Sequence, residues 1–165
     1  MILHLDFDGV VHPEPCNENE LFGRRLFLWE ILHACPIVDV VFSTSWREFI
    51  PVDELVSLVT RGGGEHFTQR FIGTTPMILP ESANCVEILP PKMDSFAADG
   101  QRIYRRETEC RMWMQGSGRQ NEPWLAVDDF DAYFSPGCPN LYLVNHKTGL
   151  TEDDTAAIIK RLTHG

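Results

Sequence analysis

The sequence predicts an α/β fold: one three-layer, Rossmann-like domain in which helices cover both faces of a mostly parallel sheet. Two observations lead to this prediction. Short apolar runs alternate along the chain with segments whose apolar residues recur at helical spacing. The chain has 165 residues, of which 43% are hydrophobic, which is enough for one sizeable core. We therefore expect a single domain over residues 1–165.

Five segments are expected to form strands. Residues 2–5, 37–42, 124–127 and 141–144 are the clearest, and a further strand is expected around residues 71–72. The clear runs are short and mostly apolar, as strands are when helices cover both faces of a parallel sheet. His4 alternates with leucines in the first run, so we expect it to be a packed strand residue and not a metal ligand.

Four segments are expected to form helices. The first spans residues 21–35 and is stopped by Pro36, and the second begins at Val52 and ends at the glycines of residues 62–64. Those glycines could cradle a phosphate, but they follow a helix, so a helix end is the preferred interpretation. The third helix covers residues 103–114.

The last helix is expected to begin with a capping box, in which Thr151 and Asp154 satisfy backbone groups reciprocally. Its apolar stripe is predicted to be Ala156, Ile159 and Leu162. Residues 80–100 have no regular pattern. The stretch is too short and irregular for a large cap, so an open site that admits a bulky substrate is expected.

The composition excludes several functional classes. With a net charge of −10, the chain is not a general duplex-DNA binder, since neutralising phosphates supplies most of that affinity. Five arginines nevertheless fall within residues 102–119 and could form a local basic surface. No apolar run approaches the roughly 20 residues that span a bilayer. The N-terminus also lacks signal-peptide features, so we expect a cytoplasmic protein without a membrane partner. The five scattered cysteines form no C-x-x-C pair, which argues against a zinc site or a disulfide framework.

Polar side chains follow three of the predicted strands, each at its carboxyl end. They are Asp6 and Asp8, then Ser43, Thr44 and Ser45, then Asp128 and Asp129. In an open parallel sheet, ligands bind at this edge. The three groups are therefore expected to meet at one rim.

Four carboxylates at one rim repel each other unless a cation or protons neutralise them. Oxygen ligands favour Mg²⁺, which we expect on Asp6, Asp8, Asp128 and Asp129. Asp6 could then attack a phosphorus atom covalently, and Asp8 could protonate the leaving oxygen and later activate water. These residues predict a magnesium-dependent phosphatase.

Phosphoryl transfer also needs donors for the phosphate oxygens. Thr44 and neighbouring backbone N–H groups are the candidates, with a cation from either Arg105 or Arg106. Beyond them, Trp46 and Arg47 could contact the substrate, by stacking on a base and by holding a second phosphate. The alternative is that Trp46 packs on the adjacent helix and Arg47 pairs with Glu48 or Asp53.

The same residues resemble the haloacid dehalogenase (HAD) superfamily of phosphohydrolases. Residues 6–10 look like its first motif, residues 40–44 its second, and residues 127–129 its fourth, which holds magnesium. Arg106 with Glu109 resembles the third motif, where most members have lysine. The resemblance spans residue 3 to about residue 150, and it implies a HAD-like fold.

A narrower resemblance is to the small capless HAD domains of bacterial Swiss Army knife RNA-repair proteins. It rests on residues 6–13, 44–47, 72–76 and 148–151. This likeness implies a substrate that is an RNA or DNA end or a nucleotide. Two alternatives stay open: a phosphatase of small nucleotides or sugars, and a non-catalytic module that binds phosphate.

Overall fold

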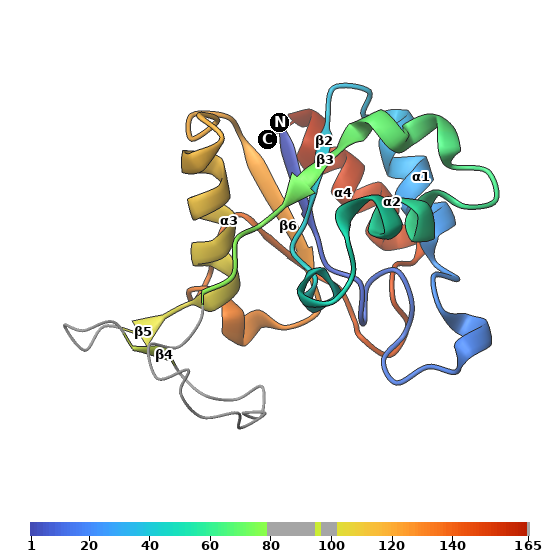
Figure 1. Cartoon of the computed structure of the whole chain (residues 1–165), viewed down its shortest axis with the longest axis horizontal. Coiled ribbons are helices and arrows are strands. Elements are labelled where there is room, and N and C mark those ends of the chain that lie inside the picture. The colour runs from blue at the N-terminus through green and yellow to red at the C-terminus, as the bar shows by residue number, and fades with distance from the viewer. Residues whose placement is uncertain (79–94, 97–101, 165) are drawn as a thin grey trace.

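A computed structural model describes residues 1–78, 95–96 and 102–164. Its centre is a five-stranded, all-parallel sheet in the order β3-β2-β1-β6-β7 (Figure 1). The strands are β1 (Ile2–Leu5), β2 (Asp39–Phe42), β3 (Phe71–Thr74), β6 (Trp124–Asp128) and β7 (Leu141–Leu143). The chain builds outward from β1 to β3 and then crosses back to β6 on the other side of β1. This reversal of strand order is where open α/β sheets bind ligands.

Helices cover both faces of the sheet, which confirms the predicted three-layer α/β architecture. Helices α1 (Arg25–Ala34), α2 (Val52–Thr60) and α4 (Glu152–His164) lie on one face, and α3 (Arg105–Gly116) lies on the other (Figure 1). Four short 3-10 helices occupy connections: η1 (Glu18–Glu20), η2 (Ser45–Glu48), η3 (Glu65–Arg70) and η4 (Asp131–Tyr133). Before α3, β4 (Ser95–Phe96) and β5 (Arg102–Ile103) form an antiparallel pair.

The core is divided by the sheet into two unequal parts. The larger part lies under α1, α2 and α4, where Leu3, Leu5 and Phe42 of the strands pack among buried helix residues. The smaller part lies under α3, where Ile2 and Val41 pack on Met114. His4 also faces α3. It is fully buried between Trp113 and Trp124, with ring centroids 5.9 and 5.5 Å away, and burial lowers its pKa to about 3. The prediction of a packed strand histidine is confirmed.

Several element boundaries differ from the sequence prediction. The first helix begins at Arg25 and not near residue 21, because Phe22 has a φ of 57°, which no α-helix accommodates. The second strand begins at Asp39, and Ile37 is 77% exposed.

The predicted apolar stripe of α4 is wrong at Ala156, which is exposed, whereas Leu162 is buried and Ile159 is half-buried against the core. Thr155, Ile158 and Leu162 are the buried residues. Thr155 is tolerated inside because its hydroxyl donates to the Thr151 carbonyl at 2.8 Å. The capping box is confirmed, since the Thr151 N–H donates to the Asp154 carboxylate at 2.9 Å and the Asp154 N–H donates back at 3.3 Å.

The glycines of residues 62–64 end a helix and do not offer a phosphate cradle. The N–H groups of Gly62 and Gly63 already donate to the Glu65 carboxylate, at 2.7 and 2.9 Å. A Cβ on Gly64 would lie 2.4 Å from the Trp29 ring, so close packing also explains the absence of a side chain there.

Four cysteines, Cys16, Cys35, Cys110 and Cys138, have free thiols, and Cys85 lies outside the described residues. The expectation for residues 80–100 also falls outside the described residues, apart from 95–96. None of the helices in the described part of the chain combines the length and apolar character needed to cross a bilayer.

Candidate active site

The predicted polar rim forms at the carboxyl ends of β1, β2 and β6. In the sheet register, Leu5 is paired with Phe42 on one side and Val127 on the other. The next residues along the three strands are Asp6, Ser43 and Asp128. Side chains along a strand alternate between the two faces of the sheet, and by the register these three residues lie on the same face as His4. Because His4 contacts Trp113 of α3, this row of side chains also faces α3.

Three carboxylates converge at this rim. Asp6, Asp128 and Asp129 each offer an oxygen, and these oxygens lie within 4.8 Å of one another. Burial, together with the charge of Asp6, raises the pKa of Asp129 to about 7 and also raises the pKa of Asp128. Burial likewise raises the pKa of Asp6, against the opposing effect of Arg106. Without a cation, the cluster therefore tends to keep protons, and the ionised form of its carboxylates is disfavoured.

Gly9 makes room for this cluster. Its φ is +67°, and a Cβ at this position would lie 2.3 Å from Asp129 Oδ2. The turn after Asp8 therefore needs glycine for its backbone conformation and for the approach of the Asp129 carboxylate.

Arg106, and not Arg105, is the cation that faces the carboxylates. Its side chain is buried, and its Nε lies 3.5 Å from Asp128 Oδ2. Burial alone would lower its pKa, but the charges of Asp6 and Asp128 outweigh burial and hold the pKa above its usual range. Arg105 is 36% exposed and pairs instead with Glu48 and Glu109. This placement supports Arg106 over Arg105 as the cation of the site, and its role there stays a prediction.

Thr44 occupies the turn that leads from β2 into η2. Its hydroxyl accepts the Trp46 N–H at 3.3 Å, and a hydrogen bond from the Thr44 side chain partly opposes the rise in the pKa of Asp6 that burial causes. Ser43 is buried, and its hydroxyl has no hydrogen-bond partner among the described residues. Ser45 is exposed and lines a cavity of about 60 Å³ beside Arg106 and Tyr133. The three residues thus lie at the rim, as predicted.

Asp8 stands apart from the carboxylate cluster and is held by two nitrogen donors. The indole Nε1–H of Trp46 donates to both carboxylate oxygens, at 2.9 and 3.2 Å. His12 Nε2 lies 3.0 Å from Asp8 Oδ1, while its Nδ1 accepts the Phe22 N–H at 3.5 Å. This second contact assigns the proton to Nε2, which donates to Asp8. A metal contact by Asp8 stays a prediction.

The arrangement and chain order of these residues agree with a known family. A family model described as "HAD domain in Swiss Army Knife RNA repair proteins" matches residues 2–155 of the 165-residue chain. The chain belongs to this family. No curated protein and no solved structure was similar enough to count as a match. The resemblance inferred from the motifs is confirmed, and membership of the HAD family supports a phosphohydrolase activity.

In this HAD domain, Arg47 lies beneath the loop of residues 43–45, which was predicted to bind phosphate, and not at its surface. Its side chain is only 3% exposed. The guanidinium donates to the backbone carbonyls of Ser43, Thr44 and Thr75 and pairs with Glu109 at 2.6 Å. The predicted pairing with Glu48 or Asp53 is therefore corrected to Glu109. With every nitrogen turned inward, Arg47 supports the loop instead of offering its charge to a second phosphate.

The other arginines of residues 102–119 whose side chains are described also have carboxylate partners. Arg111 pairs with Glu107, and Arg119 pairs with Asp39 and Glu122. These ion pairs reduce the basic surface that the sequence suggested.

The carboxylate cluster fits a divalent cation. Among the described residues, Asp128 Oδ2 is buried and accepts no hydrogen bond, although it has the ion-pair contact with Arg106 Nε at 3.5 Å, and Arg106 Nη1 is also buried without a hydrogen-bond partner. A buried carboxylate oxygen that accepts no hydrogen bond is costly unless a ligand satisfies it. Three clustered carboxylate oxygens are a donor set suited to a hard cation such as Mg²⁺.

Three residues of the HAD domain were not assigned a role at this site from sequence: His12, Glu109 as the partner of Arg47, and Phe49. Phe49 is 84% exposed next to η2. For His12, the spacing of four residues from Asp8 was an available signal. The pairing of Glu109 with Arg47 spans 62 positions, and nothing in the local sequence indicates it.

Proposed function

We propose that the protein is a magnesium-dependent phosphatase that hydrolyses a phosphomonoester through an aspartyl-phosphate on Asp6. The observation that carries the proposal is the meeting of Asp6, Asp128 and Asp129 with the buried cation Arg106 at the carboxyl ends of β1 and β6. Asp8 lies nearby in a separate hydrogen-bonded setting. Two carboxylates in different surroundings suit the different roles of nucleophile and acid.

In the first step, an Asp6 carboxylate oxygen attacks the phosphorus. The bond between phosphorus and the leaving oxygen breaks, and that oxygen takes a proton from Asp8. The products are the free alcohol and a phosphoryl group bound covalently to Asp6.

In the second step, Asp8, now ionised, takes a proton from a water molecule. The water oxygen attacks phosphorus and the bond to Asp6 breaks. Inorganic phosphate is released, Asp6 is again a carboxylate and Asp8 is again protonated.

Arg106 and Thr44 support both steps. The buried Nη1 of Arg106 has no hydrogen-bond partner in the part of the chain that the structure describes, so it is available to a phosphate oxygen. The Thr44 hydroxyl and the backbone N–H groups at the start of η2 are further donors. Residues Asp6, Asp128 and Asp129 would hold Mg²⁺, and the bound ion would neutralise phosphate charge.

The substrate is proposed to be the phosphorylated end of RNA or DNA, or a nucleotide. The family description refers to RNA repair, and this supports a nucleic-acid substrate over a sugar phosphate. Phosphatase activity on small nucleotides or sugars by the same chemistry remains the alternative.

Replacement of the nucleophile tests the proposal. Asp6→Asn is expected to abolish phosphate release from an aryl phosphate in Mg²⁺, while thermal unfolding shows that the fold is retained. Asp131→Asn, an exposed aspartate on η4, is the matched control and should keep full activity. A chelator should abolish phosphate release by the wild-type protein. Full activity of Asp6→Asn would overturn the nucleophile assignment.

A further inference from the structure

We infer that an apolar cavity on η2 binds the nucleobase of the leaving group. The cavity has a volume of about 260 Å³ and is lined by Ser45, Trp46, Phe49 and Ile50. The inference rests on the proposed phosphatase function, because it uses the direction in which the leaving group departs.

The side chains of this cavity suit a flat, uncharged ring. No charged residue lines it, and two of its four lining residues are aromatic. Phe49 is 84% exposed, more than any other large hydrophobic side chain in the described part of the chain. Leaving a phenylalanine ring in water forgoes the stabilisation that burial would give, and a stacking ligand would recover it.

The cavity lies where the leaving group must go. Asp8 protonates the leaving oxygen, and the Trp46 indole N–H is bonded to Asp8 at 2.9 Å. Trp46 is itself part of the cavity wall. A leaving group whose oxygen is at Asp8 therefore has Trp46 beside it. Phe49 and Ile50, three and four residues after Trp46, line the same cavity.

A nucleobase fits this position better than the ring of a phosphotyrosine. In an aryl phosphate the ring is bonded directly to the leaving oxygen and would stay close to Asp8. In a nucleotide the ribose separates the base from that oxygen, which lets the base extend past Trp46 towards Phe49. The net charge of −10 disfavours contacts to phosphates other than the reacting one, so uncharged stacking is the better source of additional affinity.

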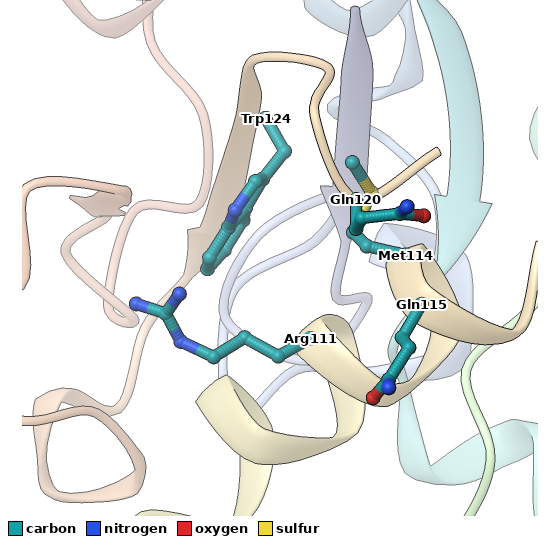
Figure 2. Close-up of a pocket in the computed structure, with 5 residues that line it drawn as sticks. All are labelled: Arg111, Met114, Gln115, Gln120 and Trp124. Carbon is teal, nitrogen blue, oxygen red and sulfur yellow. The ribbon is translucent and has the colours of Figure 1, made fainter. Parts of the chain in front are cut away.

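A second cavity, of about 420 Å³, can also take a planar ring but lies in the wrong place. Figure 2 shows Trp124 of β6 and Arg111 and Met114 of α3 around it, with Gln115 and Gln120. Trp124 precedes Asp128 by four strand residues, which is roughly 13 Å along β6 and away from the carboxyl edge. It therefore provides a control site.

The test separates base recognition from catalysis. In Mg²⁺, an Asp6→Asn protein is titrated by calorimetry with adenosine 3′- and 5′-monophosphate and with the corresponding ribose phosphates. We expect tighter binding of the nucleotides. Adding Phe49→Ala should reduce this preference roughly 5- to 150-fold, the usual worth of one stacked base. Phe49→Trp should retain it, and so should Gln120→Ala in the second cavity.

The outcomes are distinguishable. Equal binding of nucleotides and ribose phosphates, or a preference that survives Phe49→Ala, would overturn the base site. So would a preference for a phosphotyrosine peptide that Phe49→Ala removes. Phosphate release by the wild-type protein tests the proposed function separately. If the protein binds the base through Phe49 but releases no phosphate, the base site is supported and the proposed phosphatase function is refuted.

Discussion

The Arg47 guanidinium pairs with the Glu109 carboxylate at 2.6 Å, and both side chains are almost fully buried, at 3% and 1% exposure. The same carboxylate accepts the backbone N–H of Ile78 at 3.1 Å. Through Arg47, Glu109 of α3 is connected to the carbonyl groups of Ser43 and Thr44, which belong to the loop proposed to bind phosphate. Helix α3 and the loop are thus held together by one buried ion pair.

Breaking this pair should destabilise the protein. Glu109→Gln keeps the shape of the side chain but leaves Arg47 as a buried charge without its partner, so we expect the free energy of unfolding to fall by about 3–5 kcal/mol. Urea unfolding measures the loss. In a double-mutant cycle with Arg47→Met, the combined loss should be smaller than the sum of the single losses. Additive losses would show that the two side chains are not coupled.

The indole N–H of Trp46 should position Asp8 for proton transfer. Trp46→Phe keeps an aromatic ring but removes this donor. We expect kcat for an alkyl phosphate to fall about 10- to 100-fold, within the contribution of general acid catalysis. The loss should be smaller for a nitrophenyl phosphate, because its leaving oxygen needs no proton.

Phe22→Leu provides the control for this prediction. Phe22 packs edge-on against Trp46, with ring centroids 5.4 Å apart, but it donates no side-chain hydrogen bond to Asp8. It should therefore lower activity on both esters equally, if at all. An equal loss for both esters in Trp46→Phe would argue against positioning of the acid.

Some residues of the site could be predicted from sequence, because their position depends only on where a strand ends. Asp6 and Asp128 follow apolar runs, and parallel strands bring their carboxyl ends to one edge whatever the details of packing. Of the strand order, only the pairing of β1 with β6 is needed, because any order that contains this pairing gives the same cluster.

Side-chain direction was not predictable in the same way. Neighbouring positions on a helix point about 100° apart, so Arg105 and Arg106 could not be separated until the phase of α3 was known. For the same reason the stripe of α4 was predicted to include Ala156, whereas its neighbour Thr155 is the buried residue. Arg47 lies in the polar segment after β2, where the sequence indicates an exposed residue. It is buried because of its long-range contact with Glu109.

Gly9 should be required for the carboxylate cluster and not only for its turn. Gly9→Ala would place a Cβ 2.3 Å from Asp129 Oδ2, so this carboxylate has to move. We expect weaker Mg²⁺ binding by calorimetry and a loss of stability beyond the roughly 1–2 kcal/mol that a left-handed alanine costs.

Gly137→Ala isolates the backbone effect. Gly137 has a similar φ, +71°, but a Cβ there would meet nothing within 4 Å. This variant should lose only the backbone contribution and bind Mg²⁺ like the wild type. Equal Mg²⁺ affinity in both variants would refute a role for Gly9 at the metal site.

Stabilisation by Mg²⁺ should increase with pH, because the carboxylates that hold it must be ionised. Burial raises the pKa of Asp129 to about 7, from an ordinary value of 3.8, and raises that of Asp128 as well. Between roughly pH 4 and 8 the metal-free folded protein therefore binds more protons than the unfolded chain, and these groups make it less stable as pH rises. Mg²⁺ competes with those protons. The increase in Tm on adding Mg²⁺ to chelator-treated protein should be larger at pH 8 than at pH 5.5, and Asp129→Asn should weaken this pH dependence. An equal increase at both pH values would show that these carboxylates do not hold the ion.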